Sequence, residues 1–288
     1  MFLWLLIAIY AYSLPNARVI YNALVNSLGQ DATGKVPVLL VAITGLVYSI
    51  TVLITQKSLK NILVLIPCGI IAYLIMTLEP NPNKHIHIPE YVLMAWLLFA
   101  VLSMDYKSSD IIILVFILTS MLGVVDELEQ GIHPARFYGW SDMLVNSASA
   151  LIGVFTIMGL KKMKPLDLDW THYFKEIKGI LLLIFLGLIS TTITCIYLFR
   201  VQAAGEFRGV YPTWLWVFDI AFVIITTPAI YLLFRKHNDS RMKSGDTRKD
   251  LPCSETRIAQ LWIIPMLVIL FYMKSILIYI SLTGLDFV

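Results

Sequence analysis

Long runs of apolar residues are the feature that most constrains this 288-residue chain. A helix that crosses a bilayer needs about 20 mostly apolar residues, because hydrocarbon offers the backbone no hydrogen-bond partner and a helix supplies its own. Hydrophobic residues make up 58% of the chain and charged residues 14%, whereas soluble domains contain roughly 25% charged residues. The sequence therefore predicts an all-α, polytopic integral membrane helical bundle and excludes a single water-soluble domain.

The apolar runs predict about nine transmembrane helices, of which the first is short. Their approximate ranges are 2–13, 36–54, 62–78, 88–104, 111–125, 141–160, 180–199, 213–234 and 261–282. A signal peptide carries Lys or Arg before its apolar core. The first run has neither there, so we expect it to be retained. The segment after Pro15 has apolar residues every four positions, at Ile20, Leu24 and Leu28, which fits an interfacial helix or a packed loop.

Basic residues predict the orientation, because Lys and Arg accumulate in cytoplasmic loops. They are dense in 235–257 and again just after the sixth run, at Lys161, Lys162 and Lys164. If both segments lie on the cytoplasmic side of the cell membrane, the N-terminus is cytoplasmic and the C-terminus is extracytoplasmic. The loops 79–87, 126–140 and 200–212 then face outward.

The polar stretch 161–178 predicts a division of the chain. It separates a six-span front domain, 1–160, from a three-span extension, 179–288. The net charge of +3 is too small to indicate a nucleic-acid binder. The cysteines, Cys68, Cys195 and Cys253, lie too far apart in the sequence to indicate a disulfide framework or a metal knuckle.

A first polar cluster lies where the fourth predicted span begins. It contains Lys84, His87, Glu90 and Tyr91. The last three are spaced i, i+3, i+4, so a helix would present them on one face. A carboxyl group just inside the apolar zone is costly unless it is paired or faces water, which makes Glu90 a functional candidate. The alternative is an interfacial carboxylate that Lys84 neutralises.

A second polar cluster follows the fifth predicted span. Asp126, Glu127 and Gln130 lie within one helical turn, so they can be presented together. Gly131 and Pro134 are predicted to end that helix. The turn would therefore carry two carboxyl groups and an amide at the outer end of the span.

A third set leads into the sixth predicted span. Arg136 offers a planar five-donor fork that suits carboxylate or phosphate. Ser141 or Asp142 is a candidate cap for the span, and Asn146 lies one turn further on the face of Asp142. The small residues that follow allow close helix packing.

In order and spacing, these motifs resemble the VanZ-like membrane proteins. The resemblance covers about residues 1–160 and is carried by Lys84, His87, Glu90 and Tyr91, then Asp126, Glu127, Gln130 and Arg136, then Asp142 and Asn146. The family is named for a member associated with resistance to the glycopeptide antibiotic teicoplanin. The resemblance therefore implies a role in the cell envelope and a link to antibiotic resistance, without naming a reaction.

Two further charges lie inside apolar runs of the rear half. Asp219 and Lys274 both lie roughly 9–12 Å below the outer ends of their predicted spans, at about 1.5 Å per residue. Similar depth and opposite sign predict an intramembrane ion pair. We favour a role in holding the helices together over a role in chemistry.

The function expected is binding or acting on a lipid-linked or phosphate-bearing envelope molecule in an outward-facing acidic pocket, with membrane lipids around it. The residues expected to act as acids or bases are His87, Glu90, Asp126 and Glu127. Those expected to bind are Lys84, Tyr91, Gln130, Arg136, Asp142 and Asn146. The alternatives are a non-catalytic binding or partner protein, a transporter and an intramembrane glutamate protease. The sequence identifies no cofactor and leaves a divalent metal open.

Overall fold

The computed structural model describes residues 2–14, 17–56, 59–105, 109–132, 139–161, 170–204, 211–243 and 253–283. In these residues the all-α prediction is confirmed, with ten α-helices, two 3-10 helices and no strand. Eight of the helices described are long and apolar enough to cross a membrane. They coincide with the second to ninth predicted spans, which supports a multi-pass membrane protein.

The structure corrects the prediction that the first apolar run spans the membrane. Helix α1 (Phe2–Ser13) has 12 residues, which at 1.5 Å per residue reaches about 18 Å, short of the roughly 30 Å of hydrocarbon. It packs against α5 (His87–Asp105), and the Tyr10 hydroxyl donates to the backbone oxygen of Glu90 at 3.0 Å. The cytoplasmic N-terminus depended on a full first span, and it stays a prediction.

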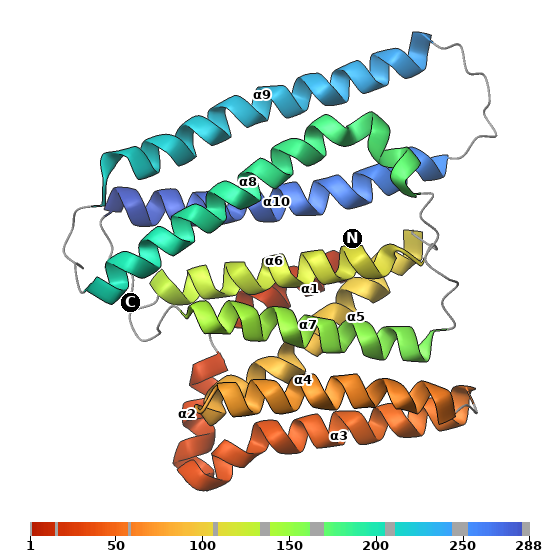
Figure 1. The fold of residues 1–288 in the computed structure, drawn as a ribbon, viewed down its shortest axis with the longest axis vertical. Helices are drawn as coiled ribbons and strands as arrows, with labels where there is room; N and C mark the ends of the chain where they lie inside the picture. The colour runs from red at the N-terminus through yellow and green to blue at the C-terminus, as the bar shows by residue number, and fades with distance from the viewer. Residues whose placement is uncertain are drawn as a thin grey trace. The chain divides into compact units, whose positions relative to one another are not determined.

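The segment after Pro15 forms a helix, so the packed-loop alternative is wrong. Helix α2 (Ala17–Leu28) runs across the direction of α3 (Gln30–Gln56) in Figure 1. Gly29 joins them with φ +83°, a left-handed conformation that glycine adopts without a steric penalty. Val19 and Ile20 are exposed on α2, which is typical of an interfacial helix.

The chain forms two compact units. The first, called the front unit below, comprises Met1–Glu127 and Gly139–Leu166, and the second, called the rear unit below, comprises Leu128–Tyr138 and Asp167–Val288. Beside α1, α2, α3 and α5, the first unit contains η2 (Leu59–Val64), α4 (Leu65–Leu78), η3 (Pro82–Ile86), α7 (Trp140–Leu160) and most of α6 (Ile111–Ile132). The second contains the end of α6 and α8 (Trp170–Ala204), α9 (Thr213–Lys243) and α10 (Cys253–Thr283).

Close helix contacts in the first unit depend on glycine. Helix α7 packs against both α4 and α5. A Cβ atom added at Gly153 of α7 would lie 2.7 Å from the Cβ of Ala95 and 3.2 Å from the Cα of Val92. On α6, a Cβ at Gly123 would lie 2.8 Å from the Cβ of Asn146. These contacts bring α5 and α7 together near the middle of both helices, and α6 and α7 together beside the motif residue Asn146.

Helix α6 continues beyond the predicted span to Ile132, which lies between Gly131 and Pro134, the two residues predicted to end the helix. Glycine costs only about 1 kcal/mol relative to alanine inside a helix, so Gly131 is tolerated in the last turn. Asp126, Glu127 and Gln130 therefore project from a continuous helix. Pro134 lies outside the described residues.

Candidate functional site

The predicted polar clusters of the front unit meet because successive helices run in opposite directions. Helix α5 runs away from the level at which these clusters lie, α6 runs back to that level, and α7 runs away from it again. The beginning of α5, the later turns of α6 and the beginning of α7 therefore lie at the same level. Sites far apart in sequence, from Lys84 to Asn146, can be joined there by side chains.

Lys84 links α7 to the segment before α5. Its Nζ lies 2.8 Å from Oδ1 of Asp142 and 3.3 Å from Oε2 of Glu79. Glu90 is thus not the acid that Lys84 neutralises. The predicted capping role is also wrong, because α7 begins after Gly139 with no side-chain cap hydrogen bond and Asp142 lies in its first turn. Sequence reasoning missed Glu79, whose signal was its position at the end of a span, five residues before a lysine.

His87 and Glu90 face each other across one turn of α5, as their spacing predicts. Nδ1 of His87 lies 3.3 Å from Oε2 of Glu90, and both side chains are largely buried. The approach does not have hydrogen-bond geometry, and neither atom has another hydrogen-bond partner in the described part of the chain. A buried imidazole and carboxyl at this separation can exchange a proton with each other or with a group that binds beside them.

Tyr91 joins α5 to α6. Its hydroxyl donates to Oδ2 of Asp126 at 2.9 Å, and both side chains are buried. Gly123 leaves room for the ring, since a Cβ there would lie 3.3 Å from Cε1 of Tyr91. The next residue on α6, Glu127, accepts from the backbone nitrogen of Gly139 at 3.1 Å and so ties α6 to the start of α7.

Asn146 joins α7 to α6. Its Nδ2 donates to the backbone oxygen of Gly123 at 3.3 Å. Its Oδ1 is buried and has no hydrogen-bond partner among the residues that the structure describes. Gln130 is buried one turn beyond Asp126 and belongs to the second unit. Arg136 lies outside the described residues.

Carboxyl groups dominate the charge of this site. Its acids are Glu79, Glu90, Asp126, Glu127 and Asp142, whereas Lys84 and His87 are the basic groups that the structure describes there. In the described ranges, no group of three or more His, Cys, Asp or Glu side chains is placed to hold a metal ion. The arrangement suits a ligand that donates hydrogen bonds. An anion that bound Lys84 would have to compete with two carboxylates.

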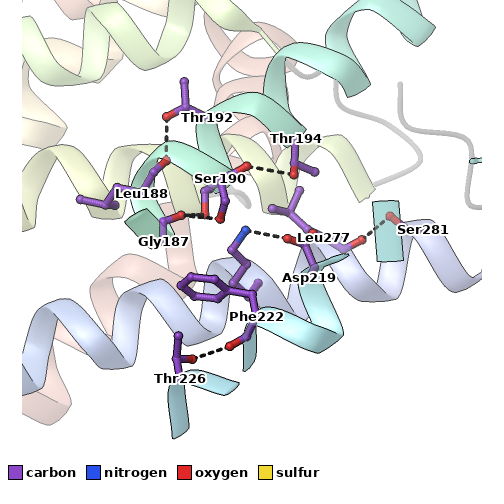
Figure 2. Close-up of polar contacts among 12 residues, drawn as sticks. Gly187, Leu188, Ser190, Thr192, Thr194, Asp219, Phe222, Thr226, Leu277 and Ser281 are labelled. Carbon is purple, nitrogen blue, oxygen red and sulfur yellow. Dashed lines mark hydrogen bonds and ion pairs between the residues drawn. The ribbon is translucent and has the colours of Figure 1, made fainter. Parts of the chain in front are cut away.

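In the rear unit the structure brings Asp219 and Lys274 together, with Nζ 2.6 Å from Oδ1 (Figure 2). Comparisons of the whole chain with models of protein families, with curated proteins and with solved structures found no match.

Proposed function

We propose that the front unit is a VanZ-like membrane domain that binds a lipid-linked cell-envelope molecule at the outer face of the membrane and acts on it by acid–base chemistry. The proposal rests on three contacts at one level of the front unit, two of which join separate motifs. They are Lys84 with Asp142, His87 with Glu90, and Tyr91 with Asp126. The link to glycopeptide antibiotic resistance follows from the resemblance and is part of the proposal.

The acceptor atoms of the site favour a particular kind of head group. Oε2 of Glu90 and Oδ1 of Asn146 are buried acceptors without hydrogen-bond partners among the described residues. Leaving such atoms unpaired costs about 1–3 kcal/mol each, which a ligand that donates to them would recover. Hydroxyl and amine groups are such donors. The sequence adds Arg136, whose planar fork of donors suits the oxygens of a phosphate group.

Acid–base chemistry is assigned to Glu90 on α5 and to the buried carboxyl groups of α6. Glu90 exchanges a proton with the bound head group, and a protonated His87 stabilises the carboxylate form of Glu90. Asp126 and Glu127 form a second acidic position on α6, where Tyr91 orients Asp126.

Lipid retention tests the proposal. The full chain is purified in mild detergent and the lipids that co-purify are identified by mass spectrometry. We expect wild-type protein to retain a phosphorylated polyprenyl lipid and Glu90→Gln to retain several-fold less. Asp105→Asn is the matched control, because it makes the same chemical change at the exposed other end of α5. If wild type retains only bulk phospholipid, the proposed ligand is wrong.

A non-catalytic binding protein is the second candidate. It is favoured by the structural use of several site residues, since Lys84 bridges two carboxylates and Glu127 accepts from the backbone of Gly139. Incubating the retained lipid with the protein separates the two candidates. A new lipid product that Glu90→Gln fails to form supports the enzyme, and an unchanged lipid supports the binding protein.

A further inference from the structure

The ion pair of the rear unit is buried and incompletely satisfied. Asp219 and Lys274 are both 0% exposed, and Nζ lies 2.6 Å from Oδ1 (Figure 2). The other carboxylate oxygen, Oδ2, is buried without a hydrogen-bond partner in the residues that the structure describes. Nζ of Lys274 also lies 5.4 Å from the centre of the Phe222 ring. Buried ion pairs repay their desolvation only when the remaining polar atoms are satisfied, so this pair is a costly way to join helices.

A contact between three helices positions the pair. Helices α8, α9 and α10 pack against one another (Figure 1). A Cβ atom at Gly187 of α8 would lie 2.5 Å from Cδ2 of Leu270 on α10 and 2.9 Å from Cζ of Phe222 on α9. The three helices therefore meet at the level of Gly187, where there is no room for another side chain.

One helical turn from this contact, each helix carries a polar residue. Thr191 on α8, Lys274 on α10 and Asp219 on α9 lie three or four positions from Gly187, Leu270 and Phe222, respectively. Each polar residue thus lies on the helix face that makes the contact. The level of the contact determines the level of the charges.

The hydroxyl groups of α8 do not complete the pair. Ser190 and Thr191 both donate to the backbone oxygen of Gly187, at 2.9 Å each (Figure 2). Their hydrogens are used there, so neither hydroxyl is a donor to Oδ2 of Asp219. A pair that only holds helices together would gain stability from such a donor, and α8 carries two hydroxyls at the right level without supplying one.

Apolar side chains separate the pair from the nearer ends of the helices. Leu198, Leu215 and Leu277, from α8, α9 and α10 respectively, are at most 1% exposed. Among the described residues, the other titratable side chain that interacts with Lys274 is the buried Cys195 thiol of α8. The carboxyl of Asp219 and the ammonium of Lys274 are thus enclosed by apolar, hydroxyl and thiol groups in the described part of this unit.

We propose that Asp219 is a proton-binding site in the membrane interior and that proton binding releases Lys274. A hydronium ion transfers its proton to Oδ2 of Asp219. An O–H bond forms on Oδ2, and the hydronium ion becomes a water molecule. The carboxylate becomes a neutral carboxylic acid, and the pair changes from net zero to one positive charge. The ion pair is thereby reduced to a hydrogen bond between an ammonium and a neutral acid. An ammonium without a counter-ion is costly at this depth, so proton binding favours movement of Lys274 toward water.

Infrared difference spectroscopy of the full chain in liposomes, during a pH titration, tests the proposal. On acidification we expect a carbonyl band of a protonated carboxyl group, which Asp219→Asn removes and Asp219→Glu shifts in frequency. Glu129→Gln is the control, because it removes another carboxyl of the same unit, the acceptor from Tyr272, and should keep the band.

A second variant distinguishes a proton-binding site from an ion pair that only holds the helices together. Lys274→Met removes the ammonium that stabilises the carboxylate, so the band should persist to more alkaline pH than in wild type. If no band responds to Asp219→Asn or Asp219→Glu at any pH, the ion pair only holds the helices together and the proposal is overturned. The readout is independent of lipid retention by the front unit.

Discussion

At the scale of single residues, the Tyr91 hydroxyl has a defined structural task. It supplies a hydrogen bond to a carboxylate oxygen of Asp126 that is buried between α5 and α6. Tyr91→Phe removes the donor and keeps the ring, so we expect the free energy of unfolding to fall by about 1–3 kcal/mol. Denaturation in detergent measures it. Tyr73→Phe on the exposed side of α4 is the control and should have no measurable effect. Equal losses in the two variants would contradict this role for Tyr91.

Arg136 is the residue whose shape, as well as its charge, is predicted to matter. If it binds a phosphate, its two parallel N–H donors recognise two oxygens at once, which a lysine cannot reproduce. We expect Arg136→Lys to lose most of the retained lipid while the melting temperature of the protein stays close to that of wild type. The opposite pattern, with lipid retained and the melting temperature lowered, would show that Arg136 instead pairs with a carboxylate of its own loop.

At the scale of helices, the contact between α5 and α7 depends on one missing side chain. Gly153→Ala places a Cβ 2.7 Å from that of Ala95, so the helices must separate. We expect a loss of about 1–3 kcal/mol in unfolding free energy, typical of overpacking. Gly69→Ala on α4, where a Cβ meets nothing within 4 Å, should be neutral or slightly stabilising. Thermal unfolding of both variants measures the difference, and a neutral Gly153→Ala would mean that α5 and α7 pack less closely.

The helix end that a sequence rule predicted wrongly is the start of α7. Neither Ser141 nor Asp142 caps this helix with its side chain, because it begins after Gly139. The capping rule describes a helix in isolation. Here the Asp142 carboxylate lies in the first turn and binds Lys84 from another segment.

At the scale of the whole molecule, the basic loops predict which side of the membrane each loop faces. In a Cys253→Ser background, a membrane-impermeant thiol reagent should label Asn81→Cys and His133→Cys in intact cells. It should label Lys57→Cys and Lys164→Cys only after the membrane is opened. Cys68 and Cys195 are buried and serve as internal negative controls. Labelling of the first two positions only in opened cells would reverse the topology and put the front site inside.

The sequence by itself determined the helical bundle, its long spans and the helix face shared by His87, Glu90 and Tyr91. These follow from local rules, because backbone satisfaction in hydrocarbon and a period of 3.6 residues act within one segment. Partner choice was decided only by the tertiary structure. Lys84 binds Asp142 and Glu79 rather than Glu90, because a side chain pairs with whichever opposite charge the helix contacts bring within reach. Close helix contacts depend on Gly123 and Gly153 in the front unit and on Gly187 in the rear unit, and the effect of each glycine depends on the helix that lies opposite.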